Sequence, residues 1–255
     1  MVDVAFFDEI IRVESRPVRV TDTSNSVESF VFQVKMADMI LDLETRHPAV
    51  KSKTSADSFR DLYSHAYNPT RNEGFFASRV IFTEGNTEEY ALPIYAEACG
   101  HRFDKDSVSV VSCGGKESID RLYRVFNELG ISCFVVMDYD DGGSGDAVSS
   151  SRQLLDWLEQ PSGVPTGILL TDKVACFQKD WEQTCAAEIA DYAALKQQAR
   201  KFLGVKEDSG KPLIARYIAR VLVARNPAVV PPTITAVLSK AIGCKHTGSC
   251  LRKPA

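Results

Sequence analysis

The sequence has no long hydrophobic run, and this absence excludes a membrane-spanning chain. The longest apolar stretches, such as residues 131–137, are shorter than ten residues, whereas a helix needs about 20 apolar residues to cross a bilayer. The N-terminal residues MVDVAFFD also lack the basic region and the small-residue cleavage site of a secretory signal. We therefore expect a soluble, cytoplasmic protein without membrane association.

The spacing of a disulfide framework is absent as well. The seven cysteines are odd in number, and several lie in apolar segments, where a free thiol packs as a small hydrophobic group. This usage is typical of a reducing compartment. With 255 residues, 44% hydrophobic and 25% charged, the chain has the composition of an ordinary globular protein rather than of a disordered or collagen-like one.

Negative charge is scarce towards the C-terminal end. Residues 191–255 contain 12 lysines and arginines but three aspartates and glutamates, whereas the preceding residues contain 18 and 31. An acidic body with a basic extension fits a polyanionic partner held beside a metal-binding centre. A solvated basic helix face is the alternative interpretation.

Residues 1–76 show apolar spacing that predicts mostly helices. Turn-rich stretches interrupt this pattern at 21–26 and 67–72. The segment carries too little apolar pattern for a complete domain. We interpret it as a stalk, or as the edge of a larger neighbouring domain that the chain does not include.

Strands and helices alternate over residues 77–190, with short connections between them. This pattern predicts a parallel sheet flanked by helices. The predicted strands are 79–83, 107–112, 131–137 and either 167–170 or 175–178. The predicted helices are 87–99, 117–129, one beginning at 180–182, and, in a basic extension over 191–255, 191–225 and 233–242. The expected fold class is α/β, a Rossmann-like parallel sheet with helical segments at both ends of the chain.

Acidic side chains follow two of the predicted strands. Glu84 comes directly after the first strand, and Asp138 and Asp140 come after the third. Glu88 lies one helical turn beyond Glu84, so it can face the same crevice. Ligands of parallel sheets collect at the carboxyl ends of the strands, and carboxylates packed together repel one another unless a cation lies among them. Oxygen ligands of this kind select Mg²⁺, or Mn²⁺ as a substitute.

These residues carry a resemblance to a known module. The segments 84–93 (EGNTEEYALP), 113–116 (CGGK) and 137–141 (MDYDD) resemble the Toprim module of topoisomerases, bacterial primases and certain nucleases. The flanking segments 72–77 (NEGFFA) and 210–212 (GKP) are similar to the OLD (overcoming lysogenization defect) nuclease family, class 2. The resemblance covers about residues 70–225 and implies a Toprim-type domain over 77–190.

The family resemblance implies a metal-dependent DNA endonuclease that uses two Mg²⁺ ions, for which Mn²⁺ can substitute. By motif, the implied metal ligands are Glu84, Glu88, Asp138, Asp140, Asp180 and Glu182. The implied catalytic residues are Glu84, Asp138, Asp140 and Lys211. Two ions about 4 Å apart suit phosphodiester cleavage, because they relieve charge on the attacking and leaving oxygens. Thr83 departs mildly from the apolar residue that usually ends this strand.

The resemblance also implies partners. The expected DNA contacts are Lys116, Arg200, Lys201, Arg216 and Arg220. In the family an ABC-type ATPase domain precedes the Toprim region. This sequence has no G-x-x-x-x-G-K-[ST] loop, so it is similar to an isolated C-terminal half, and we expect the ATPase half as a partner, with oligomers possible through it.

Several alternatives stay open. A topoisomerase-like or primase-like Toprim piece would need a tyrosine nucleophile or a zinc ribbon that is not visible. A non-catalytic metal-binding regulatory or interaction module, of Toprim or receiver-like fold, is the alternative from another class. Gly114 and Gly115 fit either an anion-binding nest or a tight turn. Cys244, His246 and Cys250 lack the fourth ligand of a zinc site.

Overall fold

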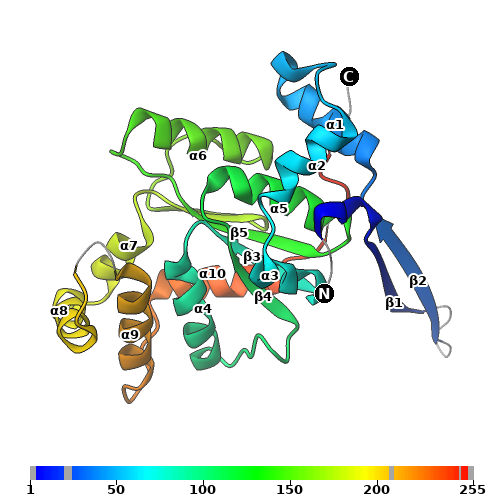
Figure 1. Ribbon diagram of the computed structural model, residues 1–255. Coiled ribbons are helices and arrows are strands. Elements are labelled where there is room, and N and C mark those ends of the chain that lie inside the picture. The colour runs from blue at the N-terminus through cyan, green and yellow to red at the C-terminus, as the bar shows by residue number, and fades with distance from the viewer. Residues whose placement is uncertain (1–3, 20–24, 207–209, 247, 252–255) are drawn as a thin grey trace.

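The computed structural model describes residues 4–19, 25–206, 210–246 and 248–251. Its centre is a five-stranded sheet in the order β4-β3-β5-β7-β6 (Figure 1). The strands are β3 (Arg79–Thr83), β4 (Val108–Ser112), β5 (Ser132–Asp138), β6 (Ile168–Leu170) and β7 (Val174–Phe177). β3 pairs in parallel with β4 and β5, and β5 with β7, whereas β6 is an antiparallel edge strand. The predicted α/β class is confirmed, and both candidates for the fourth strand are present.

Helices cover both faces of this sheet, because successive strand residues point to opposite sides. In β3, Val80 and Phe82 pack on the face that α5 and α6 cover, and Ile81 packs on the face that α4, α9 and α10 cover (Figure 1). These helices are α4 (Asn86–Ala98), α5 (Lys116–Glu128), α6 (Gly145–Trp157), α9 (Lys211–Val223) and α10 (Pro232–Gly243). A strand buried on both faces is a continuous apolar run, which is why the sequence predicts β3 so directly.

The N-terminal segment is not mostly helical, and that prediction is wrong for residues 11–19 and 25–33. Here β1 (Ile11–Arg19) and β2 (Asn25–Gln33) form an antiparallel hairpin that projects from the body (Figure 1). The side chains of Ile11, Val13, Val27 and Val31 are largely exposed on it. The remaining elements are η1 (Val4–Glu9), α1 (Met36–Arg46), η2 (Pro48–Val50), α2 (Ala56–Ser64), α3 (Pro69–Asn72) and η3 (Glu73–Phe76).

A buried ionic network joins this segment to the sheet domain. Arg46 of α1 pairs with Asp42 at 2.9 Å and with Asp120 of α5 at 2.8 Å. Arg124 of α5 pairs with the same two carboxylates, at 2.9 Å from Asp120 and 3.2 Å from Asp42. Phe7, Met39 and Phe59 share one hydrophobic core with the sheet. The predicted segment 1–76 therefore packs on the domain that follows it.

The C-terminal extension is helical, as expected, but the single helix predicted over 191–225 is divided. α7 (Trp181–Glu188) leads into α8 (Tyr192–Leu203), which ends at Gly204, a residue with a φ of 65°. Glycine adopts this left-handed conformation without a Cβ clash, so the chain turns here and α9 begins at Lys211. Among the described residues, no helix is both long and apolar enough to cross a membrane.

Candidate active site

The predicted acidic residues meet at the carboxyl edge of the sheet. Glu84 follows β3, Asp138 ends β5, and Glu88 lies in the first turn of α4. The backbone N–H of Glu84 donates to the carbonyl of Val136 at 3.2 Å, so the pairing of β3 with β5 continues up to the site. The side chain of Thr83 is buried and donates to the carbonyl of Gly85 at 2.8 Å, which satisfies the polar group that departs from the family pattern.

The glycine turn between β4 and α5 holds Glu84 in place. The backbone N–H groups of Gly114 and Gly115 donate to the Glu84 carbonyl at 3.0 and 3.1 Å. Their φ values of 73° and 137° are accessible to glycine and strained for other residues. Because both amides already have an acceptor, the structure favours the tight turn over the anion-binding nest.

Lys116 lies inside the acidic cluster. Its side chain is 8% exposed, and Nζ lies 3.2 Å from Glu84 Oε1 and 2.5 Å from Asp140 Oδ2. Burial opposes the charged form, but the hydrogen bond to Asp140 and the charge of Glu84 outweigh it and raise the lysine pKa. The expected DNA contact of Lys116 does not match this position, because its ammonium is buried and ion-paired with the two carboxylates.

The two aspartates after β5 are oriented differently from their neighbour Asp141. Asp138 Oδ1 accepts a hydrogen bond at 3.1 Å from the backbone N–H of Trp181, at the start of α7. Asp140 has a φ of 63°, and the turn directs its carboxylate to Lys116. Asp141 instead accepts from the side chain of Gln178 at 2.8 Å. Asp138 and Asp140 thus belong to the cluster, whereas Asp141 holds the neighbouring loop.

Two carboxyl groups of the cluster favour their protonated forms. Glu88 is 7% exposed, and burial, followed by the charges of Glu182 and Glu84, raises its pKa to about 8. Burial and the charge of Glu88, followed by that of Glu84, raise the pKa of Asp138 to about 9. Negative charge therefore exceeds the compensation that the buried ammonium of Lys116 supplies.

A cavity of about 450 Å³ brings the later acidic pair and the downstream lysine together. Asp180, Glu182 and Lys211 all line it, and so does Lys196 of α8. Asp180 is the N-cap of α7, and its carboxylate accepts from the backbone and side-chain nitrogens of Gln183, both at 2.6 Å. The charges of Asp180 and Glu182 also contribute to the raised pKa of Asp138, so this cavity adjoins the cluster.

The donor set suits a hard divalent cation. It consists of carboxylate oxygens, and Glu88 Oε2 is buried without a hydrogen-bond partner. In the part of the chain that the structure describes, no three His, Cys, Asp or Glu side chains surround one point closely enough to hold a metal ion. The site thus fits a divalent cation through its oxygen donors and its excess of negative charge. Without a cation, Lys116 and the protons on Glu88 and Asp138 offset part of that charge.

The other predicted DNA contacts lie on the two helices beside this cavity. Arg200 and Lys201 are on α8, and Arg216 and Arg220 are on α9. Lys201, Arg216 and Arg220 are exposed, and Arg200 is half-buried.

The structure gives the remaining aromatic and soft-ligand candidates packing roles. Trp181 is buried and its ring contacts that of Phe177, 5.7 Å between centroids, so this side chain packs in the core. His246 Nε2 hydrogen-bonds the carbonyl of Asn127 at 2.9 Å. His246, which in the sequence forms part of an incomplete zinc site, thus contacts a backbone carbonyl.

Two residues that support the site escaped prediction. Arg71 donates to the carbonyls of Ser112 and Cys113, at 2.8 and 2.6 Å, and so holds the end of β4. Ser151 of α6 is buried and donates to the carbonyl of Tyr139 at 2.9 Å, which holds the loop after Asp138. Ser144, the N-cap of α6, with Asp146 in the first turn is a helix-start signal that would have located this helix.

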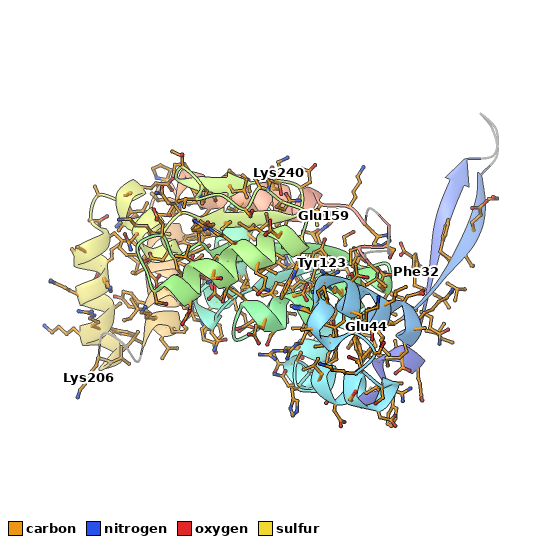
Figure 2. The ribbon with its side chains drawn as sticks, turned by 90° about the horizontal axis from the view of Figure 1, so that it is seen from above. Phe32, Glu44, Tyr123, Glu159, Lys206 and Lys240 are labelled. Carbon is orange, nitrogen blue, oxygen red and sulfur yellow. The ribbon has the colours of Figure 1, made fainter. Side chains whose placement is uncertain are left out.

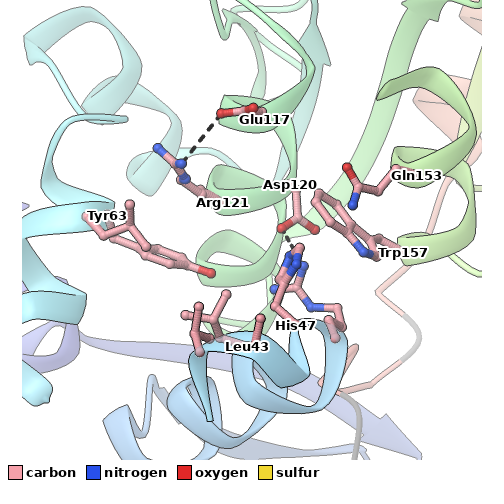
Figure 3. Close-up of a pocket in the computed structure, with 12 residues that line it drawn as sticks. Leu43, His47, Tyr63, Glu117, Asp120, Arg121, Gln153 and Trp157 are labelled. Carbon is pink, nitrogen blue, oxygen red and sulfur yellow. Dashed lines mark hydrogen bonds and ion pairs between the residues drawn. The ribbon is translucent and has the colours of Figure 1, made fainter. Parts of the chain in front are cut away.

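A second cavity, of about 340 Å³, lies between the N-terminal segment and helices α5 and α6 (Figure 3). Leu43, His47 and Tyr63 line one side, and Asp120 and Trp157 line the other (Figure 3). Of its charged residues, Arg46 and Asp120 belong to the ionic network with Asp42 and Arg124. Glu117 and Arg121 pair with each other at 3.7 Å. We assign this cavity to the junction rather than to the candidate active site.

Comparisons with known proteins agree with the sequence resemblance. Residues 75–140 match the family described as overcoming lysogenization defect protein-like, TOPRIM domain. The uncharacterized protein YbjD of Escherichia coli (strain K12) is 28% identical over 103 residues, which are 40% of this chain and 18% of that protein. The Old nuclease of Escherichia phage P2 is 25% identical over 100 residues, 36% of this chain and 17% of that protein. The matches thus span less than a fifth of each relative.

Two solved structures are also similar. The C-terminal region of the Xanthomonas campestris pv. campestris OLD protein has a TM-score of 0.47 at 19% identity, covering 67% of this chain and 94% of that chain. The C-terminal region of the Burkholderia pseudomallei OLD protein has a TM-score of 0.42 at 19% identity, covering 66% and 98%. The family match identifies residues 75–140 of this chain as an OLD-like Toprim domain.

Proposed function

We propose that this chain is the catalytic part of a metal-dependent DNA endonuclease. The observation that carries the proposal is the convergence of Glu84, Glu88, Asp138 and Asp140 at one edge of the sheet, with less positive than negative charge among them. The match to an OLD-like Toprim domain supports it, as does the similarity to a protein named Old nuclease.

The cofactor in this proposal is Mg²⁺, as two ions, with Mn²⁺ as a substitute. The residues that would hold them are the carboxylates Glu84, Glu88, Asp138, Asp140, Asp180 and Glu182. When bound, such ions supply an activated water and relieve charge on a phosphodiester. Binding would also displace the protons that the raised pKa values keep on Glu88 and Asp138.

Basic residues of the chain would orient the carboxylates of the site and offset the negative charge of the DNA. The ammonium of Lys116 bridges Glu84 and Asp140 and would orient both carboxylates through its two contacts. Lys211, which is exposed at the cavity of Asp180 and Glu182, would offset the charge of a phosphate there. Lys201, Arg216 and Arg220 would hold the neighbouring DNA backbone, because phosphate contacts position a nucleic acid without reading its sequence.

A larger protein is part of the proposal. The matched relatives are much longer than the aligned residues, and a two-stranded hairpin with an exposed apolar face is marginal alone. We infer that the face carrying Ile11, Val13, Val27 and Val31 packs on an ABC-type ATPase domain of the same protein. Oligomers would form through that half.

The test is the conversion of supercoiled plasmid by the purified chain with Mg²⁺, Mn²⁺, Ca²⁺ or EDTA. We expect nicked and then linear DNA with Mg²⁺ or Mn²⁺, and a loss of at least about 100-fold in Glu84→Gln and Asp138→Asn, because each loses a charged oxygen ligand. Glu117→Gln is the matched control, since this carboxylate is 81% exposed at the start of α5.

Other products would indicate other functions. Relaxed, covalently closed circles would indicate topoisomerase chemistry. Unchanged plasmid with every metal would overturn the endonuclease proposal for this chain. It would then favour a non-catalytic metal-binding module, an alternative that the neutralising contacts of Lys116 support.

A further inference from the structure

Helices α8 and α9 expose an aromatic surface at the end of the molecule opposite the hairpin (Figure 1). Phe202 is 74% exposed, and its ring contacts that of Tyr217, 5.2 Å between centroids at an interplanar angle of 40°. Leu213, one turn before Tyr217 on α9, is also exposed. We call Phe202, Leu213 and Tyr217 the aromatic patch. An apolar cluster left open to water marks a binding surface.

The charge around this patch is mostly positive, although Glu207 and Asp208 lie in the sequence between the two helices. Residues 192–206 and 210–225 contain no aspartate or glutamate. Figure 2 shows Lys206 extending beyond the end of α8, away from the body. The basic residues of the two stretches are Lys196, Arg200, Lys201, Lys206, Lys211, Arg216, Arg220 and Arg225. A surface of this kind is complementary to a polyanion, whereas protein interfaces have polar rims without such a bias.

The patch lies on the same two helices as part of the cavity lining. Lys196 of α8 and Lys211 of α9 line the cavity that contains Asp180 and Glu182. Phe202 lies six residues beyond Lys196 on the same helix, about 9 Å along its axis. A strand bound along these two helices could therefore contact both the cavity and the patch.

We propose that the aromatic patch stacks on unpaired bases of single-stranded DNA leading into the site, an inference that rests on the proposed nuclease function. Exposed aromatic rings within a basic groove suit single strands, because every base has a face on which a ring can stack. In a duplex these faces are covered by neighbouring bases, so paired DNA gains only the contacts to its backbone. The substrate class is thus DNA with an unpaired segment next to the cut.

The test is the affinity for fluorescent DNA of about 20 nucleotides, single-stranded or duplex, measured by anisotropy in EDTA so that no cleavage occurs. We expect Phe202→Ala to weaken single-strand binding about tenfold with little effect on the duplex, and Phe202→Trp to restore it. Phe76→Ala is the matched control, because Phe76 is 76% exposed but lies in η3, next to β4. Arg216→Glu should weaken both forms of DNA.

Three results would overturn the proposal. The first is an unchanged single-strand affinity in Phe202→Ala, and the second is an equal loss of affinity for single strands and for duplex in this variant. The third is a smaller oligomeric species for DNA-free Phe202→Ala than for the unmodified chain, which would make the patch a contact between protein chains. Plasmid cleavage by the same variant separates the two hypotheses. Cleavage with unchanged single-strand binding rejects the patch alone, whereas absence of both cleavage and DNA binding in the unmodified chain rejects the nuclease function as well.

Discussion

Two buried clusters of charged residues in this molecule differ in the balance between positive and negative charge. At the junction, two arginines face two aspartates, each nearly inaccessible to solvent, and each arginine contacts both carboxylates. At the carboxyl edge of the sheet, the buried ammonium of Lys116 pairs with Glu84 and Asp140, while Glu88 and Asp138 have no basic partner of this kind among the ion pairs of the described residues. Burial raises the pKa of Glu88 and Asp138 here, and the charges of neighbouring carboxylates raise both further.

The balance of charge distinguishes a buried cluster that stabilises the fold from one that is available for binding or catalysis. A cluster with equal numbers of positive and negative charges joins α1 to α5, and removing one member costs folding energy. A cluster with excess negative charge is not optimised for stability, and such sites are candidates for binding or catalysis. The comparison predicts opposite responses to substitution, to cations and to pH.

The largest effect is expected at the junction. Arg124→Leu leaves Asp42 and Asp120 with less compensation in a buried place, so the free energy of unfolding should fall by about 3–5 kcal/mol in urea titrations. Arg102→Leu is the control, because the Arg102–Asp104 pair is exposed, and its removal should leave the urea midpoint unchanged. If both variants behave alike, the junction network does not hold the segment.

A divalent cation should stabilise the acidic cluster. Mn²⁺ or Ca²⁺ at about 100 times its dissociation constant should add about 2.7 kcal/mol to the free energy of unfolding. Asp138→Asn should abolish this gain, while Glu117→Gln retains it. Calorimetric titration of the metal gives the affinity independently of cleavage, and equal heats in both variants would exclude Asp138 as a ligand.

The third effect, which concerns pH and is smaller than the first two when expressed per pH unit, is measured in EDTA. The ordinary pKa values of 3.8 for Asp138 and 4.5 for Glu88 rise to about 9 and about 8 on folding. The folded chain therefore retains protons that the unfolded chain releases, and the free energy of unfolding should decrease as pH rises from about 4 to about 9, by up to about 1.4 kcal/mol per pH unit for each retained proton. Asp138→Asn should flatten this slope. A slope that Asp138→Asn leaves unchanged would mean that Asp138 is ionised throughout.

Strands buried on both faces were predictable from the sequence, and half-exposed elements were not. The strand at 79–83 has the predicted bounds, and Gly130 ends α5 with a φ of 73° as expected for a residue after a helix. The hairpin was missed because Ile11, Val13, Val27 and Val31 face solvent and not the core. The division of 191–225 at Gly204 was missed because apolar helical spacing continues beyond it.

The candidate active site was also predictable only in part. Glu84, Asp138 and Asp140 follow strands, so topology alone predicts that they meet. The structure also brings Lys211 to the cavity of Asp180 and Glu182. The place of Lys116 was not predictable, because a lysine after a glycine turn points to solvent or to the site depending on packing. Their roles in catalysis and metal binding stay proposals.

The amino-acid order by itself determined the alternation of strands and helices, the edge at which the carboxylates meet, and the one-signed charge of the C-terminal helices. These are local consequences of apolar periodicity, strand polarity and composition. Only the tertiary structure decided which charges are compensated. Residues distant in sequence, such as Asp42 with Arg124 and Lys116 with Glu84, pair through packing, and the energy of a buried charge depends on the neighbours that packing supplies.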